Sequence, residues 1–193
     1  MLIQLPFRLP LIQLPISLAI VLIVLVLTAA IWDLKSRRIP NWLSLTGILC
    51  GIALNSFLYG LTGFKQSLEG MATAFGVYFV LYLVRAMGAG DVKLMAAVGS
   101  FVGPGDWFLI FLITAILGGV IALVVLGWRK RMRKTFDNVF FIVSEMMHFR
   151  APYMGREELS VKSQKALTLP HGAVIGLGCI VFISLMPLVF AVH

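Results

Sequence analysis

The chain has 193 residues, of which 60% are hydrophobic and 12% are charged, and its mean hydropathy is +1.00. Soluble globular domains carry about 25% charged residues, so this composition excludes a soluble domain. It also excludes a disordered chain, which requires low hydrophobicity. The remaining class is an integral membrane protein. The net charge of +8 then indicates membrane topology, not nucleic-acid binding, because the basic residues flank apolar segments.

The apolar segments predict membrane-spanning helices, each of which needs about 20 apolar residues. Six runs are candidates: 11–32, 42–59, 67–84, 92–102, 107–128 and 167–192. We therefore expect an all-α, polytopic helical bundle of about six transmembrane helices, forming a single membrane-embedded domain over residues 1–193. The first run is expected to be a retained span, because its apolar stretch is longer than the core of a signal peptide.

The basic residues predict the orientation of these spans. Of the 16 Lys and Arg residues, all except Arg8 and Lys65 lie in or next to the loops after the first, third and fifth runs, with Lys93 at the start of the fourth run. Loops rich in Lys and Arg face the cytoplasm. We therefore expect these three loops on the cytoplasmic side and both termini on the opposite side.

The fourth run, 92–102, is too short to cross a bilayer as a straight helix. It is either a re-entrant hairpin or a helix that begins below the membrane surface, in a polar cavity. Irregular backbone at membrane depth is tolerated where it lines water or protein, and Gly88-Ala89-Gly90 before the run suits such a turn. We favour a wet pocket on the cytoplasmic side that reaches Asp91.

The cytoplasmic segment 129–166 is the longest polar stretch and is basic at its start. Its apolar residues recur at helical spacing, which predicts an amphipathic helix. Such a helix either lies on an anionic membrane surface or packs against the bundle, and a contact with substrate is a third reading. These apolar residues are Phe136, Val139, Phe140, Val143 and Met147.

Two of the eight acidic residues, Asp33 and Asp91, stand out because each lies where a span meets the cytoplasmic face. Asp91 could serve only to cap the helix that follows it. Asp33 ends the first span, where the helix dipole disfavours an anion, although Arg37 could pair with it. A carboxylate at membrane depth indicates a functional site.

A pair of facing carboxylates suggests peptide hydrolysis. Two such groups cannot easily both ionise, so they share one proton. The ionised member can then activate water while the protonated member donates to the carbonyl oxygen of a peptide bond. Gly88 and Gly90 would let an extended substrate backbone approach closely. The sequence contains no metal-ligand spacing and no nucleotide or other cofactor motif, so we expect neither a metal nor a cofactor.

Two segments resemble the aspartate motifs of type IV prepilin peptidases. Residues 33–42 read DLKSRRIPNW, similar to the first motif, and residues 88–94 read GAGDVKL, similar to the second, GxGD, motif. The late segment Leu169-Pro170-His171-Gly172 resembles a Pro-aromatic-Gly element of the family, with histidine in the aromatic position. The resemblance covers nearly the whole chain.

The resemblance implies an aspartic endopeptidase of the bacterial inner membrane that removes the basic leader of prepilins on the cytoplasmic side. It implies Asp33 and Asp91 as the catalytic pair, with Pro40, Asn41, Gly88, Gly90 and Lys93 as supporting or substrate-binding positions. The chain has no CxxC motif. It resembles the short branch associated with tight-adherence (Flp-type) pili, which implies cleavage without N-methylation.

Two other functions use the same features. A proton-coupled transporter or channel also carries intramembrane acids, but it needs a polar path through the bilayer, and the acids here lie on one side. A non-catalytic partner of the pilus assembly machinery is the other alternative. Loss of a prepilin leader, or proton flux without that loss, would discriminate between them.

Overall fold

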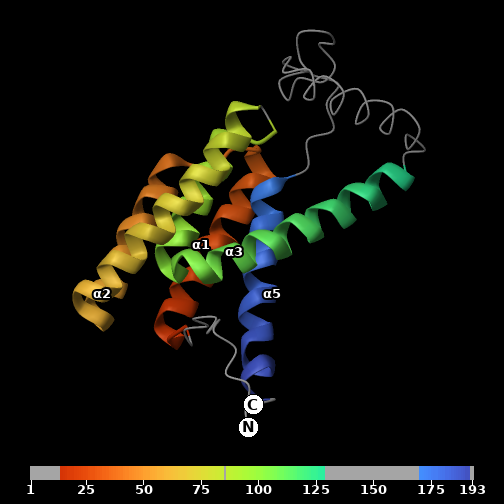
Figure 1. Cartoon of the computed structure of the whole chain (residues 1–193). Coiled ribbons are helices and arrows are strands. Elements are labelled where there is room, and N and C mark those ends of the chain that lie inside the picture. The colour runs from red at the N-terminus through yellow and green to blue at the C-terminus, as the bar shows by residue number, and fades with distance from the viewer. Residues whose placement is uncertain (1–13, 85, 129–169, 192–193) are drawn as a thin grey trace, which may run out of the picture.

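The structure is a computed structural model that describes residues 14–84, 86–128 and 170–191, and the described part is helical (Figure 1). Its elements are α1 (Ile16–Ser36), α2 (Asn41–Leu83), α3 (Ala89–Trp128) and α5 (His171–Ala191). The described ranges contain no strand, which confirms the all-α prediction for this part of the chain. The amphipathic segment predicted at 129–166 lies outside the described residues.

Helix α1 begins after Pro15, which lacks an N–H group and therefore suits the start of a helix. It ends at Ser36, because Arg37 takes a left-handed conformation (φ 53°, ψ 30°) and its N–H donates to the carbonyl oxygen of Asp33 at 2.8 Å. The helix thus extends four residues beyond the predicted end of the first apolar run. Asp33 lies inside its last turn.

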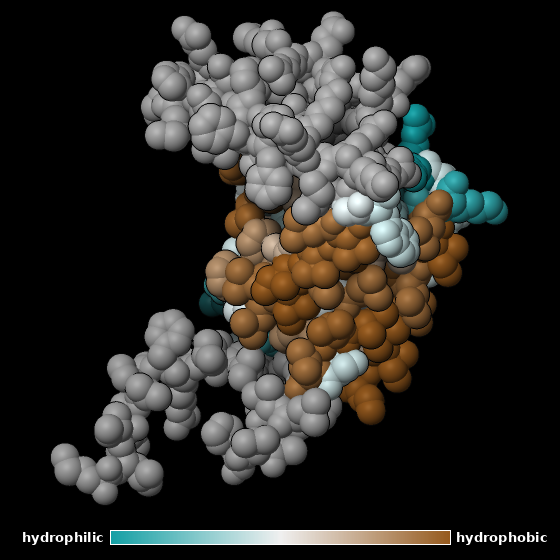
Figure 2. All heavy atoms as spheres, turned by 90° about the vertical axis from the view of Figure 1, so that its right-hand side faces the viewer, coloured by the Kyte–Doolittle hydropathy of each residue, from teal (hydrophilic) through white to brown (hydrophobic). Residues whose placement is uncertain are grey.

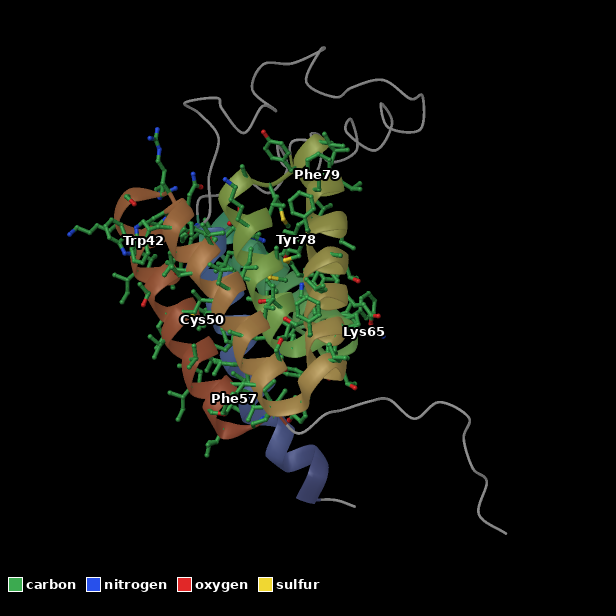
Figure 3. All side chains as sticks on the ribbon, turned by 90° about the vertical axis from the view of Figure 1, so that its left-hand side faces the viewer. Trp42, Cys50, Phe57, Lys65, Tyr78 and Phe79 are labelled. Carbon is green, nitrogen blue, oxygen red and sulfur yellow. The ribbon has the colours of Figure 1, made fainter. Side chains whose placement is uncertain are left out.

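Helix α2 is a helical hairpin broken at Gly60, whose φ of 60° and ψ of −141° are not helical. Figure 3 shows one limb running from Trp42 to Phe57 and the other returning past Lys65 to Phe79. A positive φ is accessible to glycine without steric cost. The break separates the apolar runs predicted at 42–59 and 67–84.

Helix α3 is broken at Gly103 (φ 77°, ψ 176°), directly before Pro104. The break separates the runs predicted at 92–102 and 107–128. The first limb, from Ala89 to the break, is only about 20 Å long at 1.5 Å per residue, against a hydrocarbon core of about 30 Å. The second limb turns away from α2 and passes α5 (Figure 1).

The break in α3 leaves backbone carbonyls without helical donors, and α2 supplies replacements. Pro104 has no N–H to give to the oxygen of Ser100 four residues earlier. The Asn55 side-chain amide donates to the carbonyl oxygens of Ser100 at 2.9 Å and Phe101 at 3.0 Å. The Ser67 hydroxyl donates to the same Ser100 oxygen at 2.6 Å. These buried contacts fix the short first limb of α3 against both limbs of α2.

The packing of the described helices leaves an apolar exterior. Figure 2 shows a continuous hydrophobic surface on the face it presents, with hydrophilic residues at its margins. Large apolar side chains point outward, among them Ile16 (80% exposed) and Phe57 (88% exposed). Three described helical stretches are long and apolar enough to cross a membrane: Ile16–Ser36, Asn41–Leu83 and Ala89–Val125. The protein is therefore a membrane protein, while the six-span count and the single-domain organisation remain predictions.

Candidate active site

Asp33 is held at the junction of α1 and α5. Its side chain is buried, and its Oδ2 accepts the backbone N–H of Gly172 at 2.8 Å. Gly172 lies in the first turn of α5, where backbone N–H groups lack helical acceptors and the helix dipole favours an anion. The carboxylate is therefore unfavourably placed on its own helix, as the sequence indicated, but it is stabilised by the start of another.

Asp91 caps α3 from within. It is the third residue of the helix, and its Oδ2 accepts the backbone N–H of Gly88 at 3.1 Å, while its own N–H donates to the Gly88 oxygen at 3.1 Å. The first of these bonds is one half of a capping box, in which an acid at the third helical position accepts the N–H of the residue before the helix. The capping role considered from the sequence is thus confirmed. Asp91 is half-buried and Gly88 is exposed, so the acid lies beside accessible backbone.

The fold brings the two acids to the same end of the bundle. The carboxyl groups of Asp33 and Asp91 are close enough to interact electrostatically. Ile39 lies between the helix starts that hold them. A Cβ atom added to Gly90 would lie 3.4 Å from the Ile39 Cβ, and one added to Gly172 would lie 3.0 Å from its Cδ1 and 3.1 Å from Asp33 Oδ2.

The remaining predicted site residues line the start of α2 and α3. Lys93 Nζ donates to Asn41 Oδ1 at 2.9 Å, and both side chains are exposed. Pro40 directly precedes α2, and its carbonyl oxygen accepts the Leu43 N–H at 3.2 Å. The bond between the Lys93 and Asn41 side chains joins the start of α3 to the start of α2.

Gly88 and Gly90 flank Ala89 in the turn that opens α3. A Cβ atom added to Gly88 would lie 3.3 Å from Asp91 Oδ2, tighter than most carbon contacts. Glycine at this position therefore lets the Asp91 side chain fold back onto the turn. Gly88 and Ala89 are exposed, and Gly90 is half-buried.

Two neighbours of Asp91 were not identified from the sequence. His171, the first residue of α5, acts electrostatically on the Asp91 carboxyl group, and that carboxyl group acts on the phenol of Tyr78 on α2. Tyr78 is buried and forms edge-to-face contacts with Trp107 and Phe111, at ring-centroid distances of 6.4 and 5.9 Å. Nothing distinguishes Tyr78 within its apolar run. The sequence did single out the Pro-His-Gly segment, but it assigned no role to His171, which occupies a position where the family element has an aromatic residue.

A cavity of about 390 Å³ lies at the far end, where the α2 hairpin turns and α3 is broken. The two acids do not line it. Among the described residues, no group of three or more His, Cys, Asp or Glu side chains could hold a metal ion. The cavity is lined by Thr62, Lys65, Gln66, Glu69, Val102, Pro104, Gly105 and Asp106.

The sequence matches the model of the type IV leader peptidase family over residues 20–123, a stretch that contains both acids. Three similar proteins are named prepilin leader peptidase/N-methyltransferase. The one from Myxococcus xanthus is 30% identical over 56% of this chain and 34% of its own length. The one from Escherichia coli is 33% identical over 49% and 44%, and the one from Pectobacterium carotovorum is 29% identical over 58% and 42%.

The matched regions cover less than half the length of these curated relatives. No solved structure matches the chain. The family match ends before α5, so the Pro-His-Gly segment that contacts Asp33 lies outside it.

Proposed function

Because the chain belongs to the type IV leader peptidase family, we propose that it is a membrane-embedded aspartic endopeptidase that removes the N-terminal leader of a prepilin. The observation that carries this proposal is the convergence of two carboxyl groups, one from the end of α1 and one from the start of α3. Each is oriented by the backbone N–H of a glycine. Paired, oriented carboxyl groups are the machinery of metal-independent peptide hydrolysis.

In the proposed mechanism, Asp33 and Asp91 hold one proton between them and act as a coupled unit. The ionised acid takes a proton from a water molecule, whose oxygen attacks the carbonyl carbon of the scissile peptide. The protonated acid gives its proton to the carbonyl oxygen. When the tetrahedral intermediate collapses, one of its two hydroxyl groups returns a proton to the acid that had donated one. The carbon–nitrogen bond breaks, and the leaving amine takes a proton from the acid that had accepted one.

The exposed turn at Gly88 and Ala89 supports access of an extended substrate to Asp91. A backbone without bulky side chains lets another chain approach closely. The bond between Lys93 and Asn41 joins the start of α3, which follows this turn, to the start of α2. We assign Pro40, Asn41, Gly88, Gly90 and Lys93 to supporting or substrate-binding roles on this basis.

The proposed location is the bacterial inner membrane, with the acids toward the cytoplasm and both termini outside. Its support is the positive-inside rule. Lys35, Arg37 and Arg38 follow Asp33, and Lys93 follows Asp91, whereas Lys65 lies just beyond the Gly60 turn at the other end.

We further propose that the substrates are prepilins of the Flp class, that the new N-terminus is not methylated and that the pilus assembly machinery is a further partner. The support is the resemblance to the short family branch and a sequence without CxxC pairs. Mass spectrometry of the mature pilin N-terminus tests the second point. An unmethylated terminus is the predicted result, and a methylated one made by this chain alone contradicts it.

The proposal is tested by co-expressing the chain with a candidate prepilin and measuring leader loss. Asp33→Asn and Asp91→Asn should each lower cleavage by about 10²- to 10⁴-fold, with unchanged amounts in the membrane. Glu69→Gln is the matched control, because this exposed acid lies at the other end of the bundle. Cleavage that persists in both aspartate variants contradicts the proposal, and so does proton flux without leader loss.

A further inference from the structure

The cavity at the far end of the bundle is a candidate binding site, separate from the site of the two acids. It has a volume of about 390 Å³ and lies where the α2 hairpin turns and α3 is broken. Its charged lining residues are Lys65, Glu69 and Asp106, and Thr62 and Gln66 add a hydroxyl and an amide group. Lys65 and Glu69 are exposed, whereas Asp106 is only 3% exposed. The cavity therefore presents a cation and a buried carboxyl group to the same occupant.

The buried carboxyl group of Asp106 has an unmade hydrogen bond. Its Oδ2 has no partner among the described residues, although buried polar atoms in native proteins nearly always have one. A donor that enters the cavity can supply this bond, and a cationic donor also favours the ionised carboxyl group. The site thus requires no charge on Asp106 while the cavity is empty. Because a water molecule occupies about 30 Å³ in the liquid, the cavity has room for a much larger polar group.

The cavity lies at the level of lipid headgroups, on the side of the membrane opposite the acids. The first limb of α2 runs from Asn41, at the end that holds the acids, to the break at Gly60. At 1.5 Å per residue this limb is about 30 Å long, which is the thickness of the hydrocarbon core. Figure 3 shows Trp42 near one end of the bundle and Phe57 and Lys65 toward the other. When Asn41 lies at one membrane surface, the hairpin turn and the cavity beside it lie at the other.

Apolar side chains next to the cavity suit the acyl chains of a lipid. Leu61 and Phe64 are exposed and adjoin lining residues of α2 in the sequence, and Phe108 is exposed two residues after Asp106. A small polar ligand from water would leave these side chains uncovered, whereas a lipid brings its own apolar chains to them. We therefore expect a lipid, and not a soluble molecule, to occupy the cavity.

We propose that the cavity binds a phospholipid whose headgroup carries both a primary ammonium group and a phosphate, as in phosphatidylethanolamine. The ammonium group donates to Asp106, and Lys65 binds the phosphate. Glu69 is assigned no contact, because an exposed ion pair contributes little. A choline headgroup has no N–H to donate, and a glycerol headgroup has no cation, so Asp106 selects the ethanolamine headgroup. This site does not depend on the reaction that the acids catalyse.

The test is a titration of the purified protein with three phospholipids of identical acyl chains, followed by native mass spectrometry. The wild-type protein should bind phosphatidylethanolamine about tenfold more tightly than phosphatidylcholine, as a hydrogen bond to a charged group implies. Asp106→Asn should lower the affinity for phosphatidylethanolamine about tenfold and leave that for phosphatidylglycerol unchanged. Lys65→Gln should lower both affinities, because both lipids carry a phosphate.

Lys35→Gln is the matched control, because it removes an exposed lysine charge at the end that holds the acids, and its lipid affinities should equal those of the wild type. Melting in detergent identifies a variant that fails to fold, and the exposed Lys65 keeps the test valid if Asp106→Asn does. Equal affinity of the wild-type protein for the ethanolamine and choline lipids overturns the proposal. Soluble phosphoethanolamine should not displace the lipid at equal concentration, and displacement would overturn the assignment to a lipid.

Discussion

Replacing Gly172 by proline should remove the hydrogen bond that orients Asp33. Proline is tolerated in the first turn of a helix because the N–H it lacks has no helical acceptor there. In this protein that N–H donates to Asp33 Oδ2 at 2.8 Å. A hydrogen bond to a charged group contributes about 1.5–3 kcal/mol, which corresponds to a loss of about 10- to 150-fold in kcat/KM.

Gly172→Pro both removes the N–H donor and adds carbon atoms, so the effect of the added atoms on activity must be measured by itself. In Gly172→Ala the N–H stays, but the new Cβ would lie 3.0 Å from Ile39 Cδ1 and 3.1 Å from Asp33 Oδ2. These contacts require shifts of a few tenths of an ångström. A misplacement of 1 Å lowers rates about 10²-fold, so we expect the alanine variant to lose about fivefold.

The assay is steady-state cleavage of a prepilin peptide in detergent micelles, with melting temperature as the folding control. Ala173→Pro is the matched variant. It places proline in the same turn but removes an N–H that donates to the Pro170 oxygen at 3.2 Å, not to an acid. Equal activity of the Gly172→Pro and Gly172→Ala variants would refute the reasoning, because the N–H would then contribute nothing to Asp33.

Three further predictions concern the support of the site. Asn55→Leu should destabilise the fold by about 1–3 kcal/mol, since it removes the side-chain donor of the buried Phe101 carbonyl and leaves the Ser100 carbonyl with Ser67 alone. The losses of stability caused by Asn55→Leu and Ser67→Ala should be non-additive in detergent-unfolding experiments, because both side chains donate to one oxygen. Strict additivity would contradict this prediction. Lys93→Met and Asn41→Ala should each raise KM more than they lower kcat, and their double variant should resemble either single one; independent effects would exclude the shared contact. Gly90→Cys, in a background without the native cysteines, should react with a small membrane-impermeant thiol reagent in an active protein. Protection from the reagent would argue against a wet pocket.

Composition and apolar runs predicted the helical elements well because lipid imposes a simple requirement on the outside of each helix. The runs 42–59 and 67–84 became the limbs of α2, and 92–102 and 107–128 became the limbs of α3. Apolar periodicity does not fix where a helix ends. The extension of α1 through Asp33 to Ser36 depends on the left-handed Arg37 that follows.

The acids were identifiable because a carboxylate is conspicuous in an apolar chain. Their surroundings were not, because these depend on contacts between distant residues. Asp33 and Gly172 are 139 positions apart, and no local pattern predicts that the start of α5 supplies the donor. Tyr78 was missed for the same reason: an aromatic residue in an apolar run indicates a core position, and only the folded structure places its phenol within electrostatic range of Asp91.

The central claim is that the fold brings Asp33 and Asp91 into one site, and cross-linking measures this most directly. The variant with cysteine at both positions, in a background without the native cysteines, is treated with a short bifunctional thiol reagent in native membranes. The account predicts an efficient intramolecular cross-link, and none between cysteines at positions 33 and 69, which lie at opposite ends of the bundle. A pair at 33 and 91 that resists cross-linking while both thiols react singly would contradict the account.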